Sequence, residues 1–380
     1  MSEWKKVKFL DFIVLQRGFD LTKDSIKDGP YPVVCSTSIM GYHNNYKVEG
    51  PGVVTGRSGT LGETQYVKDN FWPHNTTLFV KDFKGNNRQF VYYFLKNFDI
   101  ASMGGGAAIP SLNRNVLSNL SVTIPDLSIQ NNIATILSRY DSLIENYQKQ
   151  IKLLEEAAQR LYKEWFIDLR FPGHENTKIV DGVPEGWEKK TINDICTHIS
   201  SGSTPSRRNK SYWENGTIKW VKTKELLDGW IFDTEEYITD DGLKNSSTKI
   251  YPVNSILMAI YASPTLGRLG ILASECCCNQ AALCLIANDQ IVSWQWLYWK
   301  LFELRDEFNS IARGAGQQNI SGIVVKNKEV LVPTKQVVDA FTNIANPIFE
   351  SIKKISSQIR LLTEARDRLL PKLMSGEIAV

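Results

Sequence analysis

IKLLEEAAQRLYKEWF (Ile151–Phe166) and IRLLTEARDRLLPKLM (Ile359–Met374) are two versions of one sequence. At the same offset Pro125 aligns with Pro333, and each proline ends a short apolar segment, SVTIP or EVLVP. A repeat of this kind indicates that one structural unit occurs twice in the chain. The identical pairs within the two stretches are Ile151/Ile359, Leu153/Leu361, Leu154/Leu362, Glu156/Glu364, Ala157/Ala365, Arg160/Arg368 and Leu161/Leu369.

The two halves also begin alike, but they diverge in between. The starts align at a different offset from the ends, so the bodies between them differ by insertions. Similar tails on divergent bodies indicate one architecture that carries two different surfaces. The matches before the tails are Trp4/Trp187, Phe9/Ile192, Asp11/Asp194, SGTLG (58–62) with SPTLG (263–267), Asn75 with Asn279, and FVYYFL (90–95) with WLYWKL (296–301).

Each tail predicts a long amphipathic helix, because its apolar residues recur in steps of three and four. Asp126 or Ser128 can cap the first helix, and Pro172-Gly173 stops the chain beyond it. Each helix should span roughly 37 residues, or about 55 Å, and bury its apolar stripe against the other. A pseudo-two-fold relation between the halves makes the helices antiparallel. Arg366 interrupts the second stripe. The alternative is two helices of one compact bundle domain.

The bodies predict mixed α/β domains built from short strands. One aromatic helix is expected in each body, near 89–98 and 294–308, and VDGVPEGW (180–187) is expected to be the linker. The predicted fold class is therefore α+β: two mixed α/β domains joined by two long antiparallel, coiled-coil-like helices, with an internal pseudo-two-fold repeat. The predicted strands are 31–34, 52–56, 64–67, 77–80, 218–221, 255–260, 269–273 and 282–286. The predicted boundaries are 1–126 for the first domain, 127–173 for the central helix, 174–186 for the linker, 187–334 for the second domain and 335–380 for the distal helix.

Composition restricts the class of protein. Hydrophobic residues make up 42% of the 380 residues, which is typical of a globular chain. The net charge of +3 excludes a histone-like excess, so any basic surface must be local. We expect a cytoplasmic protein, because there is no apolar run of membrane-spanning length and the N-terminus carries charges where a signal peptide is apolar. Six cysteines without a CxxC pair, three of them consecutive (276–278), are expected to be free structural thiols.

No motif predicts a catalytic centre. There is no phosphate-binding GxxxxGK[ST], no GxSxG and no HExxH. Asn346-Pro347-Ile348-Phe349 resembles the motif of amino-methyltransferases, but it lies within the heptad pattern and is expected to be part of a kinked helix. Gly104-Gly105-Gly106 and Gly314-Ala315-Gly316 are expected to form flexible loops. We therefore predict no catalytic residue, no metal and no cofactor on this chain.

Basic and amide-rich segments are the candidate DNA contacts. DNA recognition requires cations for phosphates and planar or hydroxyl side chains for base edges. For any single residue the competing interpretation is an ordinary solvated surface group. In the first body the candidates are Arg17, Lys23, Arg57, Ser58, His74 and Asn75; in the second they are Ser203, Thr204, Arg207, Arg208, Lys210, Lys222, Lys224, Arg268, Arg313 and Gln317.

These features together resemble the specificity subunits of Type I restriction–modification systems, over the whole chain. LYKEWFIDLRFPG (161–173), joined to GVPEGW (182–187), resembles the central conserved region of that family and the start of its second recognition domain. RLLPKLMSGEI (368–378) resembles the distal conserved region, and SSGSTP (200–205) resembles the opening of many such domains. The recognition domains of the family vary freely, so the resemblance carries over no base-contact residue.

The resemblance implies that each domain recognises one half of a split, asymmetric double-stranded DNA target. It also implies that the helices set the length of the gap, the stretch of DNA between the half-targets that neither domain recognises. The helices would further dock two adenine-N6 methyltransferase subunits. Two motor-nuclease subunits can join that complex. S-adenosylmethionine, ATP and Mg²⁺ are then expected on those partners. Two alternatives remain open: a coiled-coil scaffold that binds only proteins, and a self-contained DNA methyltransferase or nuclease.

Overall fold

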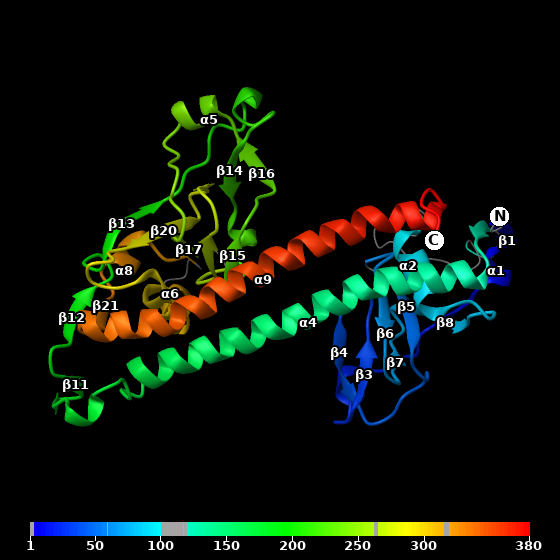
Figure 1. Cartoon of the computed structure of the whole chain (residues 1–380), viewed down its shortest axis with the longest axis horizontal. Helices are drawn as coiled ribbons and strands as arrows, with labels where there is room; N and C mark the ends of the chain where they lie inside the picture. The colour runs from blue at the N-terminus through cyan, green and yellow to red at the C-terminus, as the bar shows by residue number, and fades with distance from the viewer. Residues whose placement is uncertain (1–3, 59, 100–116, 118–119, 262–264, 315–318) are drawn as a thin grey trace. The chain divides into compact units, whose positions relative to one another are not determined.

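The computed structural model describes residues 4–58, 60–99, 117, 120–261, 265–314 and 319–380. The chain forms two compact units. Unit 1 comprises residues 1–146 and 360–380, and unit 2 comprises residues 147–359. The two long helices, α4 (Leu127–Phe166) and α9 (Lys335–Ser375), each contribute one segment to each unit. Figure 1 colours the chain from its N-terminus to its C-terminus.

The described residues of unit 1 form three small sheets. One pairs β1 (Lys5–Lys8) with β9 (Ser121–Ile124). The second is antiparallel in the order β2-β8-β5-β6, and the third has the order β4-β3-β7 with β7 parallel to β3. The bounds are β2 Val14–Arg17, β3 Tyr31–Val34, β4 Ile39–His43, β5 Gly52–Gly56, β6 Thr64–Val67, β7 Trp72–Pro73 and β8 Thr77–Asp82, with helices α1 Phe9–Phe12, η1 Lys23–Ser25 and α2 Arg88–Asn97.

The described residues of unit 2 repeat these pairings. Strand β12 pairs with β21 as β1 pairs with β9; β13-β20-β17-β18 repeats β2-β8-β5-β6; and β16-β14-β19 repeats β4-β3-β7, with the same parallel pair. The longer connection from β14 to β17 adds β15, which joins β18 in parallel, and α5. The strand bounds are β12 Glu188–Thr191, β13 Cys196–Ser201, β14 Ile218–Val221, β15 Gly229–Ile231, β16 Glu236–Ile238, β17 Ile256–Ala259, β18 Leu269–Leu272, β19 Cys277–Cys278, β20 Ala282–Ala287 and β21 Glu329–Val332.

The remaining elements of unit 2 are short. The linker contains a hairpin of β10 (Ile179–Val180) and β11 (Val183–Pro184), whose turn residues Asp181 and Gly182 both have positive φ, as a type I′ turn requires. The expected helix at 294–308 is divided at Leu304 into two helices. The helices are η3 His174–Asn176, η4 Lys210–Tyr212, η5 Thr223–Glu225, α5 Asp240–Lys244, α6 Trp294–Glu303, α7 Arg305–Gly314 and α8 Gly322–Lys326.

The long helices complete the apolar core of each body. In unit 1, Ile133 and Leu137 of α4 cluster with Leu370 and Leu373 of α9 and with the aromatic residues of the first body. In unit 2, Trp165 near the end of α4 contacts Phe341 near the start of α9, with ring centroids 6.1 Å apart. Each unit therefore pairs an early segment of one helix with a late segment of the other. This confirms the predicted antiparallel arrangement. The predicted burial of the apolar stripes is only partial, because the stripe residues Leu143 of α4 and Ile344 of α9 are exposed.

Local sequence explains the helix ends. The Asp126 carboxylate accepts a hydrogen bond from the Ile129 amide at 3.0 Å, so Asp126 is the cap that starts α4. Helix α4 has 40 residues and ends at Phe166, before the expected stop at Pro172-Gly173. Helix α9 has 41 residues and passes through Pro347. The Asn346 side chain within it accepts a hydrogen bond from Gln295, so the segment that resembles a methyltransferase motif is a structural part of the helix.

The six cysteines are free thiols, and the consecutive three are buried. Burial raises the pKa of Cys196 and of Cys277 to about 12, so both stay protonated at neutral pH. No group of His, Cys, Asp and Glu able to hold a metal ion occurs among the described residues. No helix in the described part of the chain is long and apolar enough to cross a membrane.

Candidate nucleic-acid interface

In the first body, the end of strand β2 meets the turn between β7 and β8. The Asp20 carboxylate accepts hydrogen bonds from the Arg17 guanidinium, at 3.1 Å, and from the Asn75 side-chain amide. The Arg57 guanidinium lies 3.4 Å from the Asn75 carbonyl oxygen. The structure thus brings predicted residues from three separate segments together at one edge of the body.

His74 and Ser58 hold this edge together. His74 Nε2 lies 3.2 Å from the Leu21 carbonyl, which can only accept, so Nε2 carries the proton. Nδ1 therefore accepts from the Thr76 hydroxyl at 3.2 Å. The Ser58 carbonyl accepts from the Ser36 hydroxyl at 3.1 Å. Both ring nitrogens of His74 are used to fix the turn.

The second body builds the same junction from different side chains. After β13, the Ser203 amide donates to the Cys278 carbonyl at 2.9 Å, and the Thr204 hydroxyl donates to the Gln280 side-chain oxygen. The matching bond in the first body runs from the Phe19 amide to the Pro73 carbonyl at 2.8 Å. Gly18 and Gly202 are equally placed, since a Cβ on either would lie 2.1 Å from a carbonyl oxygen of the opposing turn.

The backbone hydrogen bonds fix which residues correspond. Gly18 donates to Thr77, and Gly202 donates to Ala282. Counting back two residues from each acceptor places Asn75 opposite Gln280, and counting back three places His74 opposite Asn279. The sequence-based match of Asn75 with Asn279 was therefore wrong by one residue, because the local echo ignored the register of the turn.

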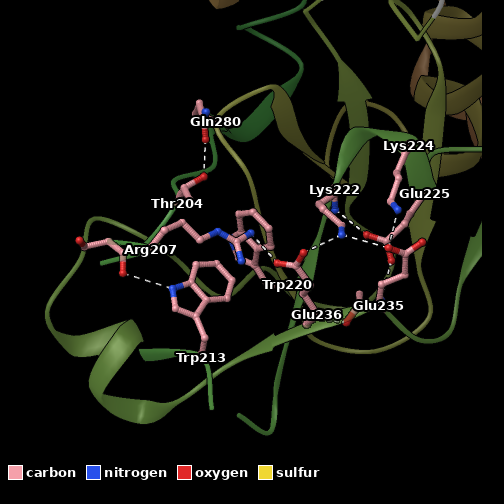
Figure 2. A network of polar contacts seen from close by, with 12 residues as sticks. Thr204, Arg207, Trp213, Trp220, Lys222, Lys224, Glu225, Glu235, Glu236 and Gln280 are labelled. Atoms are coloured by element: carbon pink, nitrogen blue, oxygen red, sulfur yellow. Dashed lines mark hydrogen bonds and ion pairs between the residues drawn. The ribbon is translucent and has the colours of Figure 1, made fainter. Parts of the chain in front are cut away.

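A charged network links the loop between β13 and β14 with the segment after β14 and the start of β16 (Figure 2). The Arg207 guanidinium stacks on Trp213, 3.5 Å from the ring centroid, and pairs with Glu236 at 2.5 Å. Lys222 pairs with Glu236 at 2.7 Å and with Glu235 at 3.0 Å. The second carboxylate, Glu235, also pairs with Lys224 at 2.5 Å.

The carboxylates of this network are held in their charged form. Partial burial alone would raise the pKa of Glu236, but hydrogen bonds from Lys222 and Arg207 bring it below its ordinary value. Hydrogen bonds from Lys224 and Lys222 lower the pKa of Glu235. Sequence reasoning missed these glutamates because it considered only cations and polar side chains, and because Glu236 begins β16, 29 residues from Arg207, with Glu235 immediately before it. Three predicted DNA-contacting cations therefore already have protein partners.

The other candidates are placed as follows. Arg208 and Lys210 are exposed beside the network and, within the described residues, form no ion pair. Lys23 is exposed at the start of η1, and Arg268 is half-buried before β18. Arg313 belongs to helix α7, and Gln317 lies outside the described residues, as do Gly104–Gly106. Ser203 accepts a hydrogen bond from Ser247 at 2.8 Å.

Residues 1–156 and 184–361 match the family model of the Type I restriction modification DNA specificity domain. This chain belongs to that family. The specificity family comprises the recognition subunits of Type I systems, and its members are not catalytic. The chain is therefore a DNA sequence-recognition subunit, and its partners are DNA and the methyltransferase and restriction subunits of such a system. The alternative of a scaffold that binds only proteins is not favoured.

The sequence is similar to those of other Type I specificity subunits over about three quarters of the chain. The Type I restriction enzyme MjaIX specificity subunit of Methanocaldococcus jannaschii is 29% identical over 301 residues, which cover 77% of this chain and 69% of that protein. The HindI specificity subunit of Haemophilus influenzae is 25% identical over 344 residues, with 74% of each chain covered. The fold is similar to that of the crystal structure of the S subunit from M. genitalium, with a TM-score of 0.66, 18% identity, and coverage of 98% and 96% of the two chains.

Proposed function

We propose that each body of this specificity subunit recognises one half of a split, asymmetric DNA target. The observation that carries the proposal is the repeat itself. The same three sheet pairings recur in both units, and so does the glycine-lined junction, yet the side chains at that junction differ. One scaffold with two different polar edges suits two different short sequences.

We further propose that the segments of α4 and α9 in each unit dock one adenine-N6 methyltransferase subunit, giving two in all. Leu153 and Leu361 occupy the same place in the repeat, one in each unit, and remain 65% and 53% exposed. Exposed apolar side chains in equivalent positions suit two copies of one partner. Catalysis, with S-adenosylmethionine, then belongs to that partner. Two motor-nuclease subunits with ATP and Mg²⁺ would join for restriction, all in the cytoplasm.

The test is methylation mapping in a host without endogenous DNA methylation. The chain is co-expressed with its methyltransferase partner, and the methyltransferase alone is the control. We expect methylated adenines in a split motif only when both proteins are present. A stable complex of the two proteins that leaves the DNA unmodified would contradict the proposal and favour a protein-binding scaffold.

A further inference from the structure

The junction in each body presents one amide side chain at an equivalent position. Gln280 is exposed and Asn75 is partly exposed, and both follow the short third-sheet strand of their body. Each amide is held from the opposing loop, Asn75 by Asp20 and Gln280 by Thr204. These two holding residues are also equivalent, since each lies two positions after the glycine that packs against the opposing turn, Gly18 or Gly202.

The two amides keep the hydrogen-bonding capacity needed for a base. In Asn75 the contact with Asp20 uses one of the two amide protons, and in Gln280 the contact with Thr204 uses one lone pair of the oxygen. A side-chain amide offers a donor and an acceptor side by side, which matches the N6 and N7 edge of adenine. Holding the amide in place lowers the entropy lost when it binds.

The surroundings of the two amides differ in a way that suits a DNA-facing surface. Asp20 places a negative charge in the first junction, and Arg17 neutralises it at 3.1 Å. In the second junction the holding residue is the uncharged Thr204, and the position equivalent to Arg17 is Ser201. The first junction thus has both the Asp20 carboxylate and its cation, Arg17, and the second junction has neither. A carboxylate without such a partner would repel the phosphates.

We propose that Asn75 and Gln280 are the equivalent base-reading side chains of the two bodies, each contacting an adenine edge in its own half-target. The inference rests on the proposed function, because it requires that each body reads DNA. It assigns specificity to two residues for which the family motifs carry no role. Asp20 and Thr204 act as positioning residues that fix the amide.

The experiment is methylation mapping of the complex of this chain and its methyltransferase, carrying Asn75→Ala or Gln280→Ala. We expect each substitution to relax the motif at one base position of one half-target, with discrimination there falling roughly tenfold to a hundredfold. The other half-target should keep its sequence. Gln290→Ala and Asn44→Ala, exposed amides of the same bodies outside the junctions, are the controls and should leave the motif unchanged.

A charge variant should change which base is preferred, and a variant that merely failed to fold would not produce such a change. Gln280→Glu keeps an acceptor but removes the donor, so the preference at the affected position should move from adenine toward cytosine, whose N4 amine donates. Thermal unfolding of each variant complex monitors folding separately.

The outcomes separate the inference from the proposed function. A split motif for the unaltered chain that stays identical in both alanine variants would overturn the inference alone. So would a uniform loss of methylation at all sites by a folded, assembled variant, or relaxation of the same half-target by both variants. If the unaltered chain gives no split motif, the proposed function itself fails, and the inference fails with it.

Discussion

The cations between β13 and η5 lie within a short stretch of sequence, but their environments differ. Arg207 is stacked on Trp213 and paired with Glu236, while its neighbour Arg208 is exposed and forms no ion pair within the described residues. Single exposed ion pairs contribute little stability, but connected ones with a stacked guanidinium fix a loop. The charge of Arg207 is therefore compensated within the protein, and that of Arg208 is available to a phosphate.

Substitution of the two arginines separates these roles. We expect Arg208→Ala to reduce the salt dependence of binding at the second half-target, lowering the slope of log K against log salt by about one. Arg207→Ala should instead lower the stability of unit 2 by about 1 kcal/mol, because half of that side chain is exposed and only the stacking and the ion pair are lost. Fluorescence anisotropy at several salt concentrations and thermal unfolding measure the two effects.

Lys178→Ala is the control for these measurements, because Lys178 is an exposed cation in the linker. An equal loss of affinity for both half-targets after Arg208→Ala would contradict the assignment of this loop to one body. A fall in salt slope confined to Arg207→Ala would reverse the roles of the two arginines.

The sequence predicted the chemistry of the candidate residues better than their partners. Arg17, Arg57 and Asn75 were predicted from their residue types. In the fold, Arg17 and Asn75 both donate to Asp20, and Arg57 donates to the Asn75 carbonyl oxygen. Gln280 was missed because its position depends on the pairing of β19 with β14, which sets the register of the turn that follows β19. A comparison of short sequence segments does not show this pairing. The DNA contacts themselves stay predictions.

At the scale of elements, the contact between α4 and α9 is polar in unit 1 and mostly apolar at the equivalent place in unit 2. In unit 1 the Arg366 guanidinium pairs with Asp141 at 2.6 Å, and the Tyr93 hydroxyl donates to the same carboxylate at 2.5 Å. Burial, and then the bond to Asp141, raise the pKa of Tyr93. The equivalent residues of unit 2 are buried and mostly apolar: Ala158, Phe349 and Trp299. Arg366, the interruption in the predicted stripe, thus belongs to a polar version of an otherwise apolar contact.

A substitution cycle tests this interpretation. We expect Arg366→Ala to destabilise unit 1 by roughly 2–3 kcal/mol, because it leaves the Asp141 carboxylate largely out of water without its cation. The triple variant Tyr93→Trp, Asp141→Phe and Arg366→Ala copies the packing of unit 2 and should recover most of that loss. Urea unfolding followed by circular dichroism measures both. A triple variant less stable than the single one would show that the α4–α9 contacts of the two units do not share a geometry.

The elements themselves follow largely from local sequence. The strands at 31–34, 52–56, 64–67 and 218–221 have the predicted bounds, because Gly, Pro, Asn and Ser delimit apolar runs there. The division of the helix at Leu304 was not predicted. Arg305 begins the next helix, and its guanidinium binds the Asp228 carboxylate, 77 residues earlier in the chain. This long-range contact at the start of α7 is not visible in the local sequence.

At the scale of the whole molecule, the internal repeat determines how the chain is divided. A division by sequence assigns each long helix to a domain of its own, whereas each compact unit takes one segment of both helices. Unit 1 needs Leu370 and Leu373 from the C-terminal segment for its core. The antiparallel pair is therefore part of both cores, and a change of helix length at the unit boundaries leaves the contacts inside each unit unaltered.

This organisation predicts the effect of lengthening the helices. We expect four residues inserted after Asn146 in α4, with four after Ile359 in α9 to keep the partners aligned, to extend each helix by about 6 Å. That is about one to two base pairs of duplex at ~3.4 Å each, so the unread gap should grow by that amount while both half-targets keep their sequences. Methylation mapping of the variant complex beside the unaltered one reads out gap and half-targets together. An unchanged gap would show that the helices do not set it. Altered half-targets would show that recognition depends on the helix boundary as well as on the two bodies.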